Sequence, residues 1–570
     1  MGEYLVSPQA HDVLTRGRII GSGETPQGMY ERVVNTIFAV ESVWKTDPGV
    51  TARNRDDFGQ LMTEKAILFG TPTLTNAGRP EYADSALSSC VVIPVDLRDR
   101  STAADKIRSY YRQNMGSGFD FSEYEDPVGL LEWLNTLSAE ETATGQYDRY
   151  IGNMGSLHVS HPRIEDFIRA KQERDLKHFN ISVDVHEGFM DAAVRGEAYK
   201  LADGKEVNAQ GLLWRMAESA AQNGDPGIIY LDRMNRDNPV EAISAYTSTP
   251  PCSEMGLAPG ETCQFGYINL AKFASPNGID WDKLGKATTL MTRGLDDAIQ
   301  VSCGGYPDSE SLRLSNLKRK IGIGVCGLAD TLVGYGVPYD SDTARSMARD
   351  MLSYINFVSK SASIELAEER GSCLAMLNRI DNKYYDGFLR KKYGPSPTNT
   401  VSADDWNTLD KKISRTGQLR NILTTSLPPT GRASILMGAT SSLEPLFGAS
   451  DWNDGTKEII EDFVQKRAPE DAGRIMVQAA REGSFQNTGI PGANVLKTAK
   501  EISPLGHLKM VAAICGEGGI YDEAASKTVN LPSNATASNV MDVFLQTHAL
   551  GLKNISVYRD GSHDSQPQKL

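Results

Sequence analysis

Apolar residues recur along this chain at two different spacings, and the change of spacing divides the sequence. Within residues 1–70, segments 7–17 (SPQAHDVLTRG) and 25–44 (TPQGMYERVVNTIFAVESVW) place apolar residues at helical spacing after a Ser or Thr start signal. From about residue 71, short apolar runs such as SSCVVIPV, FNISVDV, GIIYL, YINLA and KIGIGVCG alternate with amphipathic stretches such as 340–369. Strands that alternate with helices predict an α/β core.

The end of the chain follows the same pattern and then loses it. Residues 539–562 are typical of a helix, a glycine turn and a strand, whereas 563–570 (HDSQPQKL) has no periodicity and predicts a flexible tail. We find no internal repeat and no low-complexity linker. The pattern therefore predicts an N-terminal helical region over 1–70, one large α/β region over 71–562 and a tail over 563–570.

Composition and charge narrow the classes of function. The chain has 570 residues, of which 40% are hydrophobic and 23% charged, as in soluble globular proteins. A net charge of −14 argues against a general nucleic-acid binder, which would present a basic face. Nucleotides are not excluded, because backbone N–H groups at a helix start can hold a phosphate without a basic patch.

The chain has the features of a cytoplasmic protein. No run of about 18 apolar residues indicates a membrane span, and the first residues lack the apolar core of a signal peptide. Its seven cysteines are odd in number and widely spread, which is not typical of a secreted disulfide framework. We expect reduced thiols unless they take part in chemistry.

Two motifs carry little functional weight. The segment 322–327 (GIGVCG) matches the glycine pattern of dinucleotide loops, but it follows the charged run LKRK, and close packing of a glycine-rich strand is the favoured interpretation. His158 and His161 have the spacing of metal ligands, yet no other histidine or cysteine cluster lies nearby in sequence. We expect a structural role for both histidines and no metal site.

The segment 427–448 (LPPTGRASILMGATSSLEPLFG) carries more information. Pro-Thr-Gly before small and apolar residues predicts a tight turn into a helix start. Free N–H groups and hydroxyls there could hold a phosphate, with Arg432 adding a charged contact. An ordinary capped helix start explains the local pattern equally well.

The cysteines in TSTPPCSEMGLAPGETCQF pose the main chemical question. Cys252 follows two prolines and precedes Glu254 by two residues, and Cys263 follows eleven residues later. A single cysteine is most often a small buried hydrophobic residue. The rigid and polar setting of Cys252 favours thiol chemistry, without identifying the reaction.

The chain as a whole resembles the catalytic subunit of ribonucleotide reductases of the adenosylcobalamin-dependent, class II type. Eleven segments from about residue 7 to 562 occur in the family's order. They are TPTLTNAG, LSSCVVIPV, GSGFDFS, HPRIEDFI, FNISV, GDPGIIYLDRMNRDNP, PCSE with CQFGYINLA, KIGIGVCGLADTL, PPTGRASI with SSLEPLF, SKTVNLP and GLKNISVYRDGS. The resemblance implies a ten-stranded α/β barrel with an inner finger loop, preceded by the small helical region.

The resemblance also implies a reaction. Cys252 matches the cysteine that becomes a thiyl radical and abstracts the 3′-hydrogen of a ribonucleotide, and Glu254 matches its general base. Cys90 and Cys263 match the pair that supplies two electrons and closes to a disulfide, which thiol exchange must reopen. The product is the 2′-deoxyribonucleotide, a DNA precursor.

Binding residues carry over from the family by position. The residues that match contacts to the substrate are Thr71, Ser89, Gly116 and the phosphate turn Pro429, Thr430, Gly431, Arg432 and Ala433. A nucleoside triphosphate effector is implied after Cys90, where the spacing does not choose between Asp96 and Asp99.

Three departures from the family pattern are present. Pro250 stands where the family usually has an Asn that orients the substrate, and we expect it to slow the reaction rather than eliminate it. The last cysteine is Cys515, so a C-terminal cysteine relay is not expected, and a small thiol or a thioredoxin- or glutaredoxin-type protein would reduce the site directly. Segment 145–154 (GQYDRYIGNM) differs from the usual basic, glycine-rich loop.

Other interpretations stay open at the sequence level. No ATP-binding cone precedes the common core, so we do not expect ATP or dATP to control overall activity through such a domain. The compact form suggests a phage-encoded member of the family. The runner-up is a class I-type subunit with a separate metal-bearing radical subunit, but ISVYRDG offers Tyr558 alone instead of adjacent tyrosines. A degenerate nucleotide-binding homologue is the non-enzymatic alternative. The sequence does not determine whether the substrate is a diphosphate or a triphosphate, which effectors act, or the oligomeric state, for which a homodimer is one option.

Overall fold

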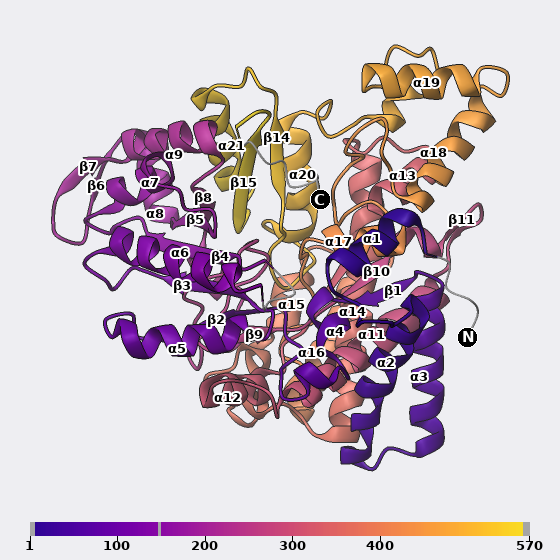
Figure 1. The fold of residues 1–570 in the computed structure, drawn as a ribbon, viewed down its shortest axis with the longest axis horizontal. Helices are drawn as coiled ribbons and strands as arrows, with labels where there is room; N and C mark the ends of the chain where they lie inside the picture. The colour runs from indigo at the N-terminus through magenta and orange to yellow at the C-terminus, as the bar shows by residue number, and fades with distance from the viewer. Residues whose placement is uncertain (1–5, 146–149, 563–570) are drawn as a thin grey trace. The chain divides into compact units, whose positions relative to one another are not determined.

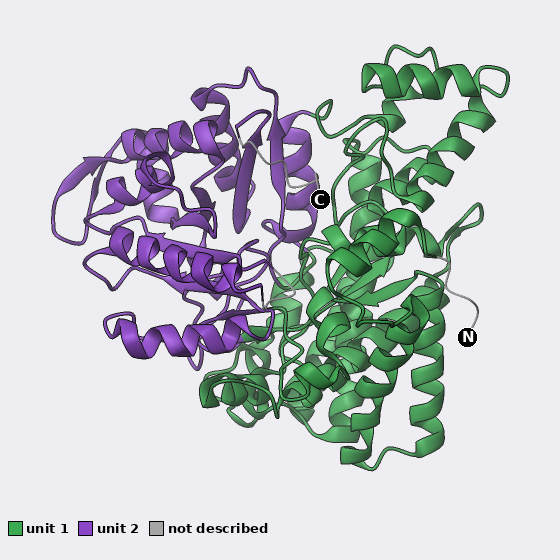
Figure 2. Cartoon of the chain, viewed as in Figure 1, with its two compact units in different colours: residues 1–89, 262–502, 520–522 green, residues 90–261, 503–519, 523–570 purple. Residues whose placement is uncertain are grey.

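The computed structural model describes residues 6–145 and 150–562, and the chain divides into two compact units (Figure 2). Unit 1 comprises residues 1–89, 262–502 and 520–522, and unit 2 comprises residues 90–261, 503–519 and 523–570. Each unit therefore combines segments that are distant in sequence, as the mixture of colours within each part of Figure 1 shows.

Capped helices form the N-terminal part of unit 1, as the sequence pattern predicts. They are α1 (Pro8–Arg16), α2 (Pro26–Ala39) and α3 (Pro48–Thr63). Each has a proline in its first turn, and the side chains of Ser7, Thr25 and Asp47 accept hydrogen bonds from backbone N–H groups of that turn. This arrangement satisfies helix-start donors that would otherwise be unpaired.

Unit 1 has a small central sheet in the order β1-β10-β13. Strand β10 (Phe265–Asn269) pairs antiparallel with β1 (Ile67–Phe69) and parallel with β13 (Gly322–Cys326). A Cβ atom on Gly324 would lie 2.9 Å from Pro428 Cδ, so this glycine of GIGVCG serves close packing of the strand. That interpretation of the motif is confirmed.

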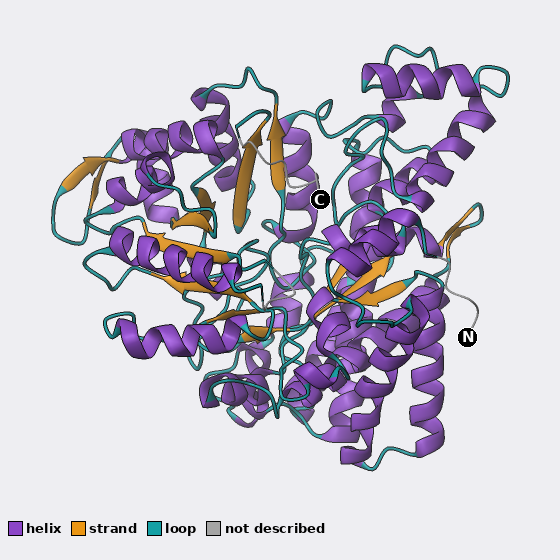
Figure 3. Ribbon diagram, in the orientation of Figure 1, coloured by secondary structure: helices purple, strands orange, loops and turns teal. Residues whose placement is uncertain are grey.

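Helices surround this sheet (Figure 3). The longer helices of unit 1 after β10 are α11 (Trp281–Ser302), α12 (Ser309–Lys318), α14 (Asp342–Arg370), α16 (Ala403–Thr416), α18 (Asp454–Arg467) and α19 (Ala472–Glu482). The shorter helices of unit 1 are α4 (Thr71–Asn76), which precedes β10, and α13 (Leu328–Gly334), α15 (Phe388–Tyr393) and α17 (Gly431–Met437), which follow it. A hairpin of β11 (Ala274–Ser275) and β12 (Gly278–Ile279) follows β10.

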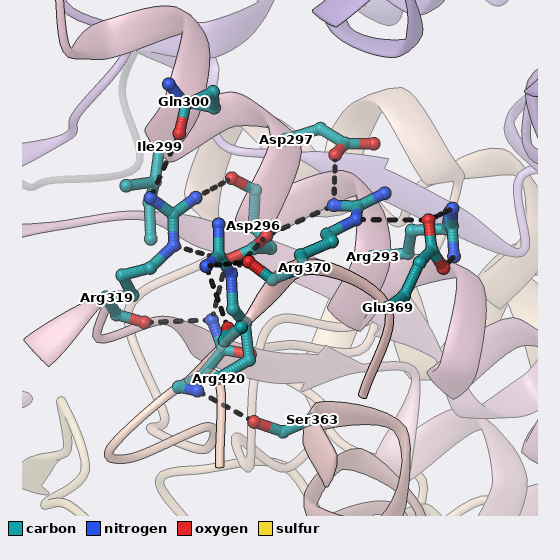
Figure 4. A network of polar contacts seen from close by, with 12 residues as sticks. Arg293, Asp296, Asp297, Ile299, Gln300, Arg319, Ser363, Glu369, Arg370 and Arg420 are labelled. Carbon is teal, nitrogen blue, oxygen red and sulfur yellow. Dashed lines mark hydrogen bonds and ion pairs between the residues drawn. The ribbon is translucent and has the colours of Figure 1, made fainter. Parts of the chain in front are cut away.

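A buried network of ionic groups joins α11, α14 and two loops in unit 1 (Figure 4). The carboxylate of Asp296, fully buried on α11, contacts Arg319 at 2.7 Å, Arg370 at 3.1 Å and Arg420 at 3.1 Å. Burial by itself raises the pKa of Asp296, but the three guanidinium groups outweigh burial and hold the pKa well below its ordinary value. This carboxylate is therefore ionised and is shared by three guanidinium groups.

Replacement of Asp296 by alanine is expected to destabilise the protein by about 3–5 kcal/mol, because buried guanidinium groups would lose their counter-charge. Urea unfolding measures the change in the free energy of unfolding. Asp462→Ala is the control, since Asp462 forms an exposed ion pair with Lys466 at 2.7 Å and should change stability by about 0–1 kcal/mol. A loss below about 1 kcal/mol for Asp296→Ala would contradict the assignment.

Unit 2 contains a larger sheet in the strand order β14-β15-β8-β5-β4-β3-β2. Strands β2 (Cys90–Val92), β3 (Gly116–Asp120), β4 (Asn153–His158), β5 (Phe179–Asp184) and β8 (Gly227–Ile229) run parallel to one another. Strand β15 (Asn554–Arg559) pairs antiparallel with β8 and parallel with β14 (Thr528–Leu531). The parallel strands begin at one edge of the sheet, which places Cys90 beside Gly116.

Helices connect the strands of unit 2 and cover them (Figure 1). They are α5 (Arg100–Tyr111), α6 (Pro127–Ala143), α7 (Ile164–Glu173), α8 (Glu187–Arg195), α9 (Ala209–Asn223), α10 (Leu231–Arg236), α20 (Pro504–Cys515) and α21 (Ala537–Ala549). A small hairpin of β6 (Ala198–Lys200) and β7 (Glu206–Asn208) lies between α8 and α9 in the chain.

The α/β class predicted from sequence is confirmed, with one difference in detail. Strand pairing in the described residues gives separate sheets, and no closed ten-stranded ladder is traced among them. Within residues 6–145 and 150–562, none of the helices is long and apolar enough to cross a membrane.

Candidate active site

A loop in unit 2 carries Cys252 and Glu254. Its base is closed by an antiparallel bridge between Ser248 and Leu257, so the intervening residues form the finger-like loop that the family resemblance implies. Cys252 is partly exposed, whereas Glu254 is only 2% exposed. The thiol is therefore accessible while the carboxylate beside it is shielded from water.

The local backbone explains the two prolines before Cys252. The N–H of Ser253 donates to the carbonyl oxygen of Pro250 at 3.0 Å, which closes a turn around the cysteine. Ser253 has φ of +57°, a left-handed conformation that is uncommon outside glycine. Proline fixes its own φ, so Pro250 and Pro251 make the backbone rigid immediately before the strained turn at Ser253.

Strand β3 brings Cys90 to this loop. A Cβ atom on Gly116 would lie 3.3 Å from Cys90 Sγ and 3.3 Å from Pro251 Cδ. A Cβ atom on Gly118 would lie 2.2 Å from the carbonyl oxygen of Thr249. The two glycines therefore allow the loop and the Cys90 thiol to approach the strand, and the structure brings together Cys90, Gly116 and the residue that precedes Cys252.

A second group of predicted site residues gathers in unit 1. The backbone N–H of Ser89 donates to the carbonyl oxygen of Cys263 at 2.9 Å. The N–H of Gly70 donates to the carbonyl oxygen of Phe265 at 2.8 Å, and Thr71 begins α4 directly after it. Backbone hydrogen bonds thus bring Ser89, and Gly70 just before Thr71, beside the segment from Cys263 to Phe265 that enters β10.

The predicted phosphate turn is a helix start in unit 1. Thr430 is the N-cap residue of α17, and its hydroxyl oxygen accepts a hydrogen bond from Ser442 N–H at 2.8 Å. Pro429 and Gly431 are exposed, Arg432 is partly exposed and Ala433 is buried. The turn is therefore exposed at Pro429 and Gly431, while the buried Thr430 side chain anchors it through its hydrogen bond with Ser442.

Asp330 on α13 anchors the residues that follow this turn, and sequence analysis missed it. Its Oδ2 accepts hydrogen bonds from Thr440 N–H at 2.7 Å and Thr440 Oγ1 at 3.1 Å. Burial raises the pKa of Asp330 to about 6 in spite of these hydrogen bonds. Its only sequence signal is an acidic residue within an apolar helix start, GLADTL.

The raised pKa of Asp330 predicts a pH-dependent stability. The protonated form is favoured in the folded protein, so its stabilising effect is present below about pH 4 and is lost as pH rises through about 6. Asp330→Asn keeps an acceptor for Thr440 and cannot ionise. The variant should match the wild type near pH 4 and exceed its free energy of unfolding by up to about 3 kcal/mol at pH 8.

Urea unfolding between pH 4 and 8 measures this difference. Asp462→Asn, an exposed site, serves as the control and should show no comparable change with pH. A constant difference between Asp330→Asn and the wild type over this range would show that the carboxyl has an ordinary pKa.

The structure distinguishes the two acidic candidates of the effector site. Asp99 is the N-cap of α5, and its oxygens accept from Thr102 N–H at 3.3 Å and Thr102 Oγ1 at 2.7 Å. Asp96 is exposed and contacts only its neighbour Arg98 among the interactions described. In segment 145–154, residues 146–149 lie outside the described residues.

The two histidines considered as metal ligands contact protein groups instead. His158 Nδ1 lies 2.7 Å from Ser160 Oγ, and His161 Nε2 lies 3.0 Å from the carbonyl oxygen of Tyr124. Burial lowers the pKa of both imidazoles. In the described part of the chain, no group of three or more His, Cys, Asp or Glu residues is arranged to hold a metal ion.

Comparison with known proteins supplies the family. The model of the ribonucleotide reductase barrel domain matches residues 102–558. A vitamin B12-dependent ribonucleoside-diphosphate reductase of Mycobacterium tuberculosis (strain CDC 1551 / Oshkosh) is 31% identical over 95% of this chain and 77% of its own length. A protein of the same description from Thermoplasma acidophilum is 30% identical over 89% of this chain and 65% of its own length.

A solved structure has the same fold. The alpha subunit of the class Id ribonucleotide reductase of Actinobacillus ureae superimposes with a TM-score of 0.77 and 17% identity, covering 98% of this chain and 97% of its own. The chain therefore belongs to the ribonucleotide reductase barrel family, whose reaction reduces ribonucleotides to 2′-deoxyribonucleotides.

Proposed function

We propose that this chain reduces ribonucleotides through a thiyl radical at Cys252, with adenosylcobalamin as the radical source. The observation that carries the proposal is the loop that presents a partly exposed Cys252 beside a buried Glu254, with the Cys90 thiol packed near the preceding Pro251 through Gly116. A lone structural cysteine would require neither the second thiol nor the shielded carboxylate.

The roles of the residues follow from the electron balance. Abstraction of the 3′-hydrogen by Cys252 activates the ribose, and Glu254 accepts the 3′-OH proton. The 2′-OH then leaves as water, and its overall replacement by hydrogen consumes two electrons and two protons. Cys90 and Cys263 supply them and close to a disulfide, and the 3′-hydrogen returns from Cys252 so that the thiyl radical is regenerated.

The neighbourhood of Ser89 supports the assignment of the cysteine pair. Ser89 is bonded to the backbone of Cys263, and Cys90 is the next residue in the chain. No disulfide joins any of the seven cysteines, all of which lie within the described residues. A thioredoxin- or glutaredoxin-type protein, or a small thiol, must reopen the disulfide after each cycle.

The residues present fit adenosylcobalamin as the radical source. Of the seven cysteines, all within the described residues, only Cys252 and Cys303 are not buried, so the radical-bearing thiol is accessible from outside its loop. Strand β15 presents Ser556, Val557 and Tyr558 and thus lacks two adjacent tyrosines for a radical relay. When bound, adenosylcobalamin supplies the radical chemistry that a thiol alone lacks.

Substrate and effector contacts are proposed from the positions that match the family's contacts. The residues that bind the ribonucleotide are Thr71, Ser89, Gly116 and the turn Pro429–Ala433. The exposed N–H groups of the turn and the side chain of Arg432 contact the phosphates of the ribonucleotide. Asp96 is the better candidate for the nucleoside triphosphate effector, because Asp99 already serves as a helix cap. Phage origin, a homodimer and a cytoplasmic location stay predictions.

The deciding experiment is a deoxynucleotide assay with ribonucleoside diphosphates and triphosphates, effector and dithiothreitol. Product that forms only when adenosylcobalamin is added supports the proposal. Product that forms only with a co-expressed metal-bearing radical subunit overturns the cofactor assignment in favour of the class I type. If neither condition gives product, the chain is a degenerate nucleotide-binding homologue.

A further inference from the structure

The carbonyl groups of the two residues on either side of Cys252 accept hydrogen bonds from asparagine side chains in distant parts of unit 2. Asn180 Nδ2, on β5, donates to the carbonyl oxygen of Pro251 at 2.8 Å. Asn554 Nδ2, at the start of β15, donates to the carbonyl oxygen of Ser253 at 2.9 Å. The residue before the thiol and the residue after it are thus each fixed from outside the loop.

The asparagine of β15 is itself fixed. Asn554 is 6% exposed, and its Nδ2 makes a second hydrogen bond to the carbonyl oxygen of Ala525 at 2.9 Å. Both amide hydrogens of Asn554 are therefore used, one on the loop and one on the segment that leads to β14. The neighbouring Lys553 is anchored by an ion pair with Asp237 at 2.8 Å.

A third contact holds the end of the loop. The carboxylate of Glu523 accepts hydrogen bonds from Tyr246 Oη at 3.0 Å and from the backbone N–H of Gly256 at 3.2 Å. A Cβ atom on Gly256 would lie 2.2 Å from the Tyr246 ring, so the chain passes the ring too closely for any other residue. The loop is therefore fixed at its end as well as around the cysteine.

These contacts act on the backbone rather than on the thiol. Ser253 has the left-handed φ of +57°, which a free serine would leave for a commoner conformation. A hydrogen bond to its carbonyl oxygen opposes that rotation, and such a rotation would redirect the Cys252 side chain. Hydrogen abstraction depends steeply on such geometry, since a displacement of about 1 Å can cost roughly a hundredfold in rate.

The geometry points to Asn180 and Asn554 as positioning residues that together set the direction of the Cys252 thiol. Neither residue need touch the substrate, since each acts through the peptide group that it holds. The inference rests on the proposed function of Cys252 for its effect on turnover. Its effect on the thiol itself can be measured without substrate or cofactor.

Alkylation by iodoacetamide, followed by peptide mass spectrometry on the nucleotide-free protein, measures the thiol directly. Cys303, the other cysteine that is not buried, is an internal reference in unit 1. Asn554→Ala and Asn180→Ala should each raise the alkylation rate of Cys252 relative to Cys303 by threefold or more. Asn180 is exposed, so its variant tests the inference even if Asn554→Ala folds poorly.

Turnover with adenosylcobalamin provides the second measurement. Each variant should lower kcat by tenfold or more and leave KM for the nucleotide within twofold. Asn153→Ala is the matched control, because Asn153 is buried in the same unit and its Nδ2 also makes two hydrogen bonds, to Ser138 Oγ and the carbonyl oxygen of His178, both at 3.0 Å. It should alter neither the alkylation ratio nor kcat beyond twofold, even where it lowers the melting temperature.

Unchanged alkylation ratios in both asparagine variants would overturn the inference. A rise in KM without a change in kcat would also overturn it, because Asn180 and Asn554 would then be substrate-binding residues. Failure of the proposed function has a different result. In that case either the wild type forms no product or Cys252→Ala retains turnover, while the alkylation ratio still reports whether the two amides hold the loop.

Discussion

Cys252→Ala is expected to abolish ribonucleotide reduction while nucleotide binding stays within about twofold of the wild type. The substitution removes the only thiol on the loop between Ser248 and Leu257 and leaves the prolines, the Ser253 turn and the Asn180 and Asn554 contacts in place. Because the thiyl radical forms on that sulfur, no alternative atom of the loop can perform the abstraction. Turnover should fall below detection, and a residual rate above a tenth of the wild type would refute the assignment.

The appropriate control is Cys303→Ala. Cys303 is also partly exposed, but its sulfur contacts the carbonyl oxygen of Ile299 on α11, and burial raises the pKa of its thiol. We expect turnover of this variant within twofold of the wild type. Mixing enzyme, effector, dithiothreitol and adenosylcobalamin should give an electron paramagnetic resonance signal that Cys303→Ala retains and Cys252→Ala loses.

Much of the fold could be predicted because it rests on local signals. Ser7, Thr25 and Asp47 mark the N-terminal helices by side-chain capping, which is a short-range interaction. The runs FNISVDV and KIGIGVCG predict strands because they are short and rich in Val and Ile, and both form strands. The turn at Pro429 likewise follows from three adjacent residues.

The supports of the site could not be predicted because they join residues far apart in the chain. A side-chain amide that donates to a distant backbone carbonyl produces no recognisable pattern in the sequence. The segments FNISV and LKNIS therefore do not indicate that Asn180 and Asn554 contact the same loop. The charges of α11 have the same character. Asp296 and Asp297 would be typical of a solvated helix face, and only the fold brings Arg370 to them.

Cys90→Ser and Cys263→Ser are each expected to eliminate repeated turnover, because each removes one of the two thiols that supply electrons. Pre-reduced wild-type enzyme without added reductant should form about one product per chain and stop, since the proposed pair holds two electrons. Added dithiothreitol should restore turnover in the wild type and in neither variant. Cys303→Ser should behave like the wild type throughout.

Peptide mapping after that single turnover identifies the bond. The proposal requires a disulfide between Cys90 and Cys263 in the wild type, while the buried Cys326, Cys373 and Cys515 should still be thiols. Burial raises the pKa of the Cys326 and Cys373 thiols, so their reactive thiolate forms are scarce. Recovery of both Cys90 and Cys263 as free thiols alongside one equivalent of product would show that the electrons come from elsewhere. A disulfide from Cys90 to Cys252 instead would remove the distinction between the radical thiol and the reducing pair, because one sulfur would then perform both tasks.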